Sequence, residues 1–159
     1  MAVASRMECM SVVDRSVIRP IAICVFRHEG RILVGEGYDP VKQEKYHRPV
    51  GGSLQFGETS ERAVRREIRE ELGVELREPR LLGVLENLFI CEGQQAHEIV
   101  FVYEARFTDR TLYDRPMIRG YEEHAGAYAA VWRDLHAGGD APTLHPEGLA
   151  DLLRDSGDC

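Results

Sequence analysis

The sequence predicts a fold of the α/β or α+β class, a sandwich in which helices pack on a mixed β-sheet. Strand-like segments recur along the 159-residue chain, and only two segments have the period of an α-helix. Strands interleaved with so few helices favour this architecture. The length fits a single domain spanning residues 1–159, with residues 1–15 expected to be flexible or to form an added N-terminal strand.

The first elements are expected to be two strands joined by a turn. Residues 17–26, VIRPIAICVF, are largely apolar and predict a strand in which Pro20 occupies a bulge or an edge position. After a short polar turn, residues 31–37 predict the partner strand. Residues 38–49 are polar and are expected to form a loop.

The second half of the chain predicts three more strands and a closing helix. Residues 81–91 and 97–107 are separated by a turn, and the latter alternate in polarity as a strand does. Residues 125–132 predict a further strand, and residues 145–155 a short final helix.

The most strongly marked element is a helix over residues 58–72. Thr59 is a residue type that caps helix N-termini, and Gly73 stands where a C-terminal cap is expected. At about 100° per residue, three carboxylates border the apolar stripe of this helix on one side, while Arg62, Arg65 and Arg69 lie on the other. These carboxylates are Glu67, Glu70 and Glu71.

Carboxylates spaced i, i+3 and i+4 repel one another unless solvent or a cation separates them. Mg²⁺ is a natural candidate, because it prefers carboxylate oxygens and keeps water ligands for phosphate substrates. The alternative is a solvated acidic face. The spacing by itself favours that alternative, since E-x-x-E-E is common on exposed helices.

The residues around the helix favour the metal instead. Nine positions follow the pattern G-x5-E-x7-R-E-U-x-E-E-x-G-U, where U is a bulky aliphatic residue, and this pattern resembles the Nudix box in full. The resemblance covers residues 17–153 and implies an α/β/α sandwich around a mixed sheet. The matching positions are Gly52, Glu58, Arg66, Glu67, Ile68, Glu70, Glu71, Gly73 and Val74.

The resemblance implies a hydrolase that splits a phosphoanhydride bond with Mg²⁺ or Mn²⁺ as cofactor. Bound metal ions neutralise phosphate oxygens and lower the pKa of a bound water. The residues implied to hold the metal are Glu67, Glu70 and Glu71, together with the backbone carbonyl of Gly51.

The same resemblance implies the catalytic residues. Glu67 or Glu70 would accept the proton of the attacking water, and Arg66 would orient a neighbouring carboxylate such as that of Glu58. Gly52 lets the backbone pass close to the metal and the phosphates.

A base can also come from outside the box in this family. Residues 121–124, YEEH, offer Glu122 and Glu123 for this role. A merely acidic loop is the alternative, and it is the one that the local sequence favours.

Substrate contacts are expected from two segments. Lys45 and Arg48 precede the glycine turn and could meet phosphates, with ordinary surface charge as the alternative. Asn87, Phe89 and Tyr103 could line a base pocket, because aromatic faces stack on nucleobases. For the two aromatic residues, core packing is the alternative.

Several substrates remain open at this point. Nucleoside triphosphates, including oxidised forms such as 8-oxo-dGTP, and dinucleoside polyphosphates such as diadenosine tetraphosphate are the first choices. ADP-ribose or nucleotide sugars are an alternative, and a catalytically idle nucleotide-binding module is another. The complete set of box acids argues against the idle module.

The composition limits which binding partners and which cellular location are expected. The net charge of −7 argues against a nucleic-acid polymer, which usually meets a basic face. No apolar run approaches the length that spans a bilayer, and the N-terminal residues lack the pattern of a signal peptide. The four cysteines form no close pair, so reduced thiols and a cytoplasmic location are expected. Family analogy and an apolar N-terminal strand suggest a homodimer.

Overall fold

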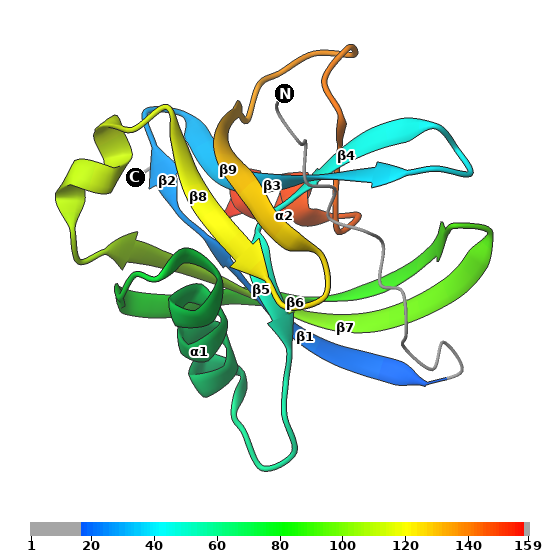
Figure 1. The fold of residues 1–159 in the computed structure, drawn as a ribbon, viewed down its shortest axis with the longest axis horizontal. Helices are drawn as coiled ribbons and strands as arrows, with labels where there is room; N and C mark the ends of the chain where they lie inside the picture. The colour runs from blue at the N-terminus through cyan, green and yellow to red at the C-terminus, as the bar shows by residue number, and fades with distance from the viewer. Residues whose placement is uncertain (1–16, 158–159) are drawn as a thin grey trace.

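Residues 17–157, the part of the chain that the computed structural model describes, form two β-sheets and two α-helices (Figure 1). The expectation for residues 1–15 lies outside these residues. The strands are β1 (Ile18–Val25), β2 (Arg27–His28), β3 (Arg31–Asp39), β4 (Glu44–Arg48), β5 (Val50–Ser53), β6 (Leu76–Cys91), β7 (Gln94–Phe107), β8 (Met117–Glu122), β9 (Gly126–Asp134) and β10 (Thr143–Leu144). The α-helices are α1 (Ser60–Leu72) and α2 (Leu149–Asp155), and η1 (Arg110–Asp114) is a 3₁₀-helix.

The strands are divided between two sheets. One has the order β5-β1-β7-β6, and the other has the order β10-β4-β3-β9-β8, with β2 paired to β3. The β1–β7 and β4–β10 pairs are parallel, and the other pairs within residues 17–157 are antiparallel. The predicted mixed α+β fold is therefore confirmed, although its strands form two sheets where one was expected.

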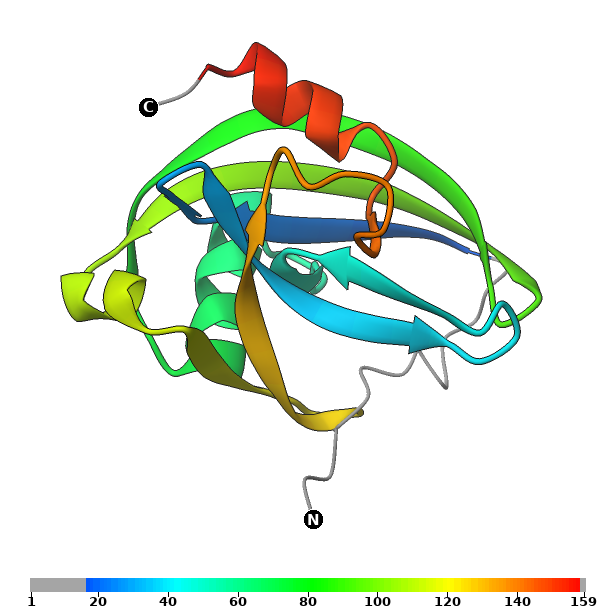
Figure 2. The same cartoon turned by 90° about the horizontal axis from the view of Figure 1, so that it is seen from above.

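The two helices lie on opposite faces of the β5-β1-β7-β6 sheet, and Figure 2 shows α2 outside the long β6–β7 ribbon. Alternate residues of β1 point to opposite faces. Ala22 and Cys24 pack in the cluster that contains the buried face of α1, whereas Ile21 and Ile23 pack with Leu149 of α2. Neither helix in residues 17–157 has the length and apolar character needed to cross a membrane.

Helix α1 has the ends that its sequence predicts. The Thr59 side chain accepts a hydrogen bond from the backbone N–H of Arg62 at 3.3 Å. Gly73 adopts the left-handed conformation, with φ of 67°, and its N–H donates to the carbonyl of Arg69 at 3.0 Å. These local bonds satisfy backbone groups that a helix end otherwise leaves unpaired.

Several segments differ from the prediction, since β5, β8 and β10 were not predicted, and two of the differences concern segments considered for the site. The expected loop over residues 38–49 contains strand β4, whose polar residues gave no apolar period. Pairing with β3 forms this strand, and the ring of Tyr46 covers Gly37, where any Cβ atom would overlap it. Similarly, residues 121–124 are only partly a loop, because Tyr121 and Glu122 belong to β8.

The described cysteines are not all reduced. Cys24 is a free, buried thiol, as expected. Cys91 at the end of β6 is disulfide-bonded, so the expectation of reduced thiols is wrong for this residue.

Candidate active site

Arg66 of α1 connects three carboxylates of the Nudix-box pattern. Its Nε and Nη2 atoms donate to the two oxygens of Glu58 at 2.8 and 3.0 Å. Its Nη1 atom donates to Glu67 Oε1 at 2.9 Å and to Glu70 Oε2 at 3.1 Å. Nη2 also donates to the carbonyl of Ser53 at 3.0 Å, which ties the helix to the end of β5. The expected contact between Arg66 and Glu58 is therefore present, and it holds the pKa of Glu58 below its usual range.

Gly52 brings strand β5 against the carboxylate of Glu67. A Cβ atom at Gly52 would lie 2.6 Å from both Cδ and Oε1 of Glu67, closer than carbon atoms normally approach. Gly51 is equally confined on the other side, because its Cβ atom would overlap the backbone of β1 at Ala22 and Ile23. The two glycines thus let β5 lie between β1 and the acidic edge of α1.

Glu71 lies deeper than the other box acids and is only 7% exposed. The hydroxyl of Tyr128 donates to its Oε2 atom at 3.0 Å. Burial raises the pKa of Glu71 to about 8, and the nearby carboxylates of Glu122 and Glu67 add to the rise. Tyr128 reaches this position from β9 across Gly120, where a Cβ atom would lie 2.7 Å from Cε1 of the ring.

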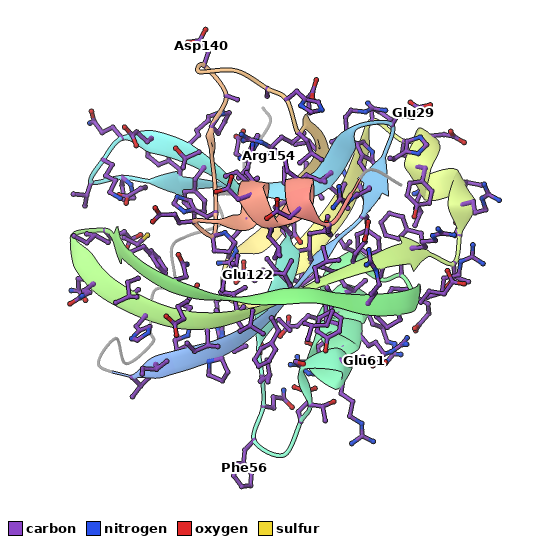
Figure 3. All side chains as sticks on the ribbon, turned by 180° about the vertical axis from the view of Figure 1, so that it is seen from behind. Glu29, Phe56, Glu61, Glu122, Asp140 and Arg154 are labelled. Atoms are coloured by element: carbon purple, nitrogen blue, oxygen red, sulfur yellow. The ribbon has the colours of Figure 1, made fainter. Side chains whose placement is uncertain are left out.

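Glu122 joins the box acids although it lies more than fifty residues further along the chain. It ends β8, and Figure 3 shows it near the centre of the molecule, far from Phe56 at the tip of the β5–α1 loop. Its Oε2 atom is buried and has no hydrogen-bond partner within residues 17–157. Glu123, the other candidate base, follows in a turn and is exposed. The fold therefore brings only Glu122 to the box.

A pocket adjoins these acids, between the end of the β6–β7 ribbon, strand β4 and the segment before α2. Arg48 lines it beside Glu122. Burial lowers the pKa of Arg48, but the carboxylates of Glu98, Glu122 and Glu71 outweigh this effect and raise it. The guanidinium group consequently lies among the acids of both the box and the pocket.

Most of the predicted substrate residues line this pocket. Arg48, Lys45, Asn87 and Phe89 all contribute to its wall. The ammonium group of Lys45 is 62% exposed and lies 2.9 Å from a carboxylate oxygen of Glu36.

Tyr103 does not line the pocket. Its ring is buried in the core that contains α1, and its hydroxyl lies 2.7 Å from that of Ser60. Its large apolar area is thus used for packing rather than for stacking on a base, which corrects the expectation for this residue.

Other pocket residues were not identified from the sequence. One of them had a signal: Glu98 is in phase with the buried residues Val100 and Val102, so an acid stands at an inward position of β7. The pocket residues without a sequence assignment are Ile23, Asp39, Lys42, Glu44, Tyr46, Ile90, Cys91, Glu98, Val100, Thr143, His145 and Pro146.

Solved structures of other proteins share this fold. A MutT NUDIX hydrolase from Burkholderia pseudomallei aligns with a TM-score of 0.63 and 28% identity, over 86% of this chain and 97% of that one. A NUDIX hydrolase from Nitrosomonas europaea aligns with a TM-score of 0.61 and 16% identity, over 88% of each chain. A MutT protein from Bacillus halodurans aligns with a TM-score of 0.53 and 16% identity, over 87% of this chain and 80% of that one.

The sequence model of the NUDIX domain matches residues 18–153, which is most of the chain. This match agrees with the structure, in which Gly52 of the box pattern lies on β5 and three of its acids lie on α1. The chain therefore belongs to the NUDIX domain family, and it is a hydrolase that acts on pyrophosphate bonds.

Proposed function

We propose that this protein is a divalent-metal-dependent pyrophosphohydrolase of nucleoside triphosphates, including oxidised forms such as 8-oxo-dGTP, and/or of dinucleoside polyphosphates such as diadenosine tetraphosphate. The observation that carries the proposal is the approach of Glu122 to the acids of α1, next to a pocket that contains Arg48. Carboxylates are crowded here beside the guanidinium group of Arg48, as a metal-bound polyphosphate requires.

The side chains fit Mg²⁺ or Mn²⁺. The candidate ligands are all oxygen donors, which hard cations prefer. Repulsion from Glu122 and Glu67 contributes to the raised pKa of Glu71, so a cation placed among these groups would be favoured electrostatically. Within residues 17–157, no three acidic, histidine or cysteine side chains converge closely enough to form a ready-made metal site. We propose that Glu67, Glu70 and Glu71, with the carbonyl of Gly51, hold the metal.

When bound, the metal would supply charge neutralisation and a more acidic water. The protein itself would have to accept the proton of the attacking water. Glu67 and Glu70 both already accept hydrogen bonds from Arg66, whereas Oε2 of Glu122 has no such partner in the described part of the chain. We therefore assign proton transfer to Oε2 of Glu122, while Arg66 orients the box acids.

Arg48 is the residue best placed to meet a phosphate. It lies on the wall that joins the box to the pocket, and none of the hydrogen bonds or ion pairs resolved in residues 17–157 engages its guanidinium group. A guanidinium group can bind a phosphate through two parallel hydrogen bonds. Asn87 and Phe89 lie further along the pocket and would contact the base.

ADP-ribose or a nucleotide sugar is the second candidate substrate class, because the same box would bind its diphosphate. A catalytically idle nucleotide-binding module is the third reading. The buried, unpartnered oxygen of Glu122 opposes it, since a site that only binds phosphate gains nothing from an unneutralised acid.

The test is a substrate panel with Mg²⁺ or Mn²⁺ and with excess EDTA. We expect hydrolysis of ATP, GTP, 8-oxo-dGTP or diadenosine tetraphosphate that stops in EDTA and returns with metal. Product analysis identifies the bond, since a monophosphate with pyrophosphate marks attack at the α-phosphorus. Undiminished hydrolysis in the chelator would contradict metal dependence. A preference for ADP-ribose or a nucleotide sugar would select the second class, and binding without turnover would select the idle module.

We also propose that residues 1–159 form a single domain, that the protein is cytoplasmic and that it forms a homodimer. The family match over residues 18–153 supports the single domain. The homodimer rests on the family analogy given above. The cytoplasmic location was expected from reduced thiols, and the disulfide bond of Cys91 does not support that argument.

A further inference from the structure

A buried acid stands at the inner wall of the pocket, beyond Arg48. Glu98 on β7 is 3% exposed and lines the pocket. Directly across from it on β6, Asn87 donates from Nδ2 to Glu98 Oε2 at 3.2 Å. The amide therefore fixes the orientation of the carboxylate.

The other oxygen of Glu98 is available to a ligand. Oε1 is buried and has no hydrogen-bond partner in residues 17–157. Arg19 on β1 lies opposite, with Nη2 at 3.7 Å, an ion-pair distance that is too long for a hydrogen bond. A buried oxygen that lacks a donor is costly, so a donor supplied by a ligand would be bound strongly.

The position of Arg48 indicates which end of a nucleotide reaches Glu98. Arg48 lies near Glu98 as well as the acids of the box, since Glu98, Glu122 and Glu71 all raise its pKa. A polyphosphate held at the box would approach Arg48 first, and its negative charge would be repelled from Glu98. The group that reaches Glu98 must therefore be neutral and rich in N–H donors.

Apolar side chains also contribute to the wall of this pocket. Ile23, Val100 and Phe89 line it, and Pro146 contributes from the segment before α2. Apolar side chains together with an oriented polar pair suit a nucleobase, because its faces pack while its edge forms hydrogen bonds.

We propose that Glu98, oriented by Asn87, recognises the edge of a guanine-type base and so selects guanine nucleotides over adenine nucleotides. This inference rests on the proposed function. Guanine presents a carbonyl and two neighbouring N–H donors along one edge. Oε1 of Glu98 accepts from those donors, and the second Nδ2 proton of Asn87 donates to the carbonyl. Oxidation at C8 leaves this edge unchanged, so oxidised guanine belongs to the same class.

Comparison with adenine and hypoxanthine gives the proposal a specific order of base preference. Adenine presents a ring acceptor where guanine presents a ring donor, so it would set a lone pair against the carboxylate. Hypoxanthine keeps the ring donor and the carbonyl but lacks the exocyclic amine. The expected order of preference is therefore guanine, then hypoxanthine, then adenine.

The first measurement compares kcat/KM of the full chain for GTP, ITP and ATP with Mg²⁺. We expect GTP to exceed ATP by at least about tenfold, with ITP between them, since a buried polar group left unpaired has a cost of this order. A GTP to ATP ratio below about threefold would overturn the inference.

The second measurement uses Glu98→Gln, with Glu86→Gln as the matched control. Glu86 is an exposed acid on the same strand as Asn87, and it lies outside the pocket. We expect Glu98→Gln to lower the GTP to ATP ratio to below about threefold and Glu86→Gln to keep it. If Glu98→Gln retains the original ratio, the acid is only structural and the inference is wrong.

A binding measurement tests the preference for guanine independently of the proposed hydrolysis. Calorimetric titration of GMP, IMP and AMP in EDTA requires neither metal nor turnover, and it is expected to give the same order of affinity. If no triphosphate is hydrolysed, the proposed function fails, and this titration still tests whether the pocket selects guanine. The same selectivity can be tested if Glu98→Gln does not fold, because the titration needs only the unaltered protein. Equal affinities for GMP and AMP would overturn the inference.

Discussion

Replacing Glu71 by glutamine should stabilise the metal-free protein and remove part of its pH dependence. The change keeps the size of the side chain and removes its charge. Glu71 is buried on α1, and its surroundings contribute one donated hydrogen bond, from Tyr128, and the repulsion of Glu67 and Glu122. The ionised form therefore lies in an environment that disfavours it.

The magnitude follows from the raised pKa. Burial raises the pKa of Glu71 from its ordinary value of 4.5 to about 8, so the folded protein binds more protons than the unfolded chain between these values. The contribution of Glu71 to stability is consequently largest below about pH 4.5 and is lost as the pH rises through about 8. A tenfold change in a proton-binding constant corresponds to about 1.4 kcal/mol. The rise of this pKa from 4.5 to about 8 therefore corresponds to a loss of at most about 5 kcal/mol in the free energy of unfolding at high pH. Glutamine does not titrate and avoids this loss.

The assay is urea unfolding in EDTA at pH 5, 7 and 9. We expect Glu71→Gln to be more stable than the original protein at pH 9, by up to a few kcal/mol, and the difference to shrink toward pH 5. Glu61→Gln is the control, because Glu61 is an exposed acid on the same helix and pairs with Arg65 at its surface. A difference that does not vary with pH, or a variant that is less stable at pH 9, would refute the reasoning.

Three further predictions concern turnover and assembly. Glu70→Gln should lower kcat by at least about 10²-fold, the order expected for losing a key electrostatic or acid–base group, and near-normal turnover would contradict a role for this acid in the reaction. Gly52→Ala should lower kcat at least about tenfold with little change in the urea midpoint, because the new Cβ atom displaces the flexible end of Glu67. Gly138→Ala, where a Cβ atom meets nothing within 4 Å, is its control, and equal kcat in the two variants would contradict this reasoning. Sedimentation at micromolar concentration should show a dimer, and a species near 18.0 kDa would contradict the homodimer.

The sequence by itself determined the helix and the local order of its acids. Thr59 and Gly73 fixed the ends of α1, and the spacing of Glu67, Glu70 and Glu71 fixed their directions around the helix axis. These relations hold because a helix is stabilised by bonds between residues a few positions apart, so its geometry follows from adjacent sequence.

The motif marked certain glycines as part of the box, but the tertiary structure shows why glycine is needed there. The sequence identified Gly52 as a box position. Only the packed structure shows that the carboxylate of Glu67 occupies the space where a side chain on Gly52 would lie. Strand β4 is similar, since its polar residues acquired a strand conformation through pairing with β3.

The rest of the site depended on contacts between distant segments. Glu122 and Glu123 are neighbours in sequence, and the register of β8 with β9 buries part of the first and leaves the second exposed. Phe89 and Tyr103 are both strand aromatics, yet one lines the pocket and the other packs in the core below α1. Glu98 acquired its orientation from Asn87 only when β6 and β7 paired. Strand pairing and burial join residues far apart in the chain, so local composition specified which residues are acidic or aromatic, and the tertiary structure decided which of them meet.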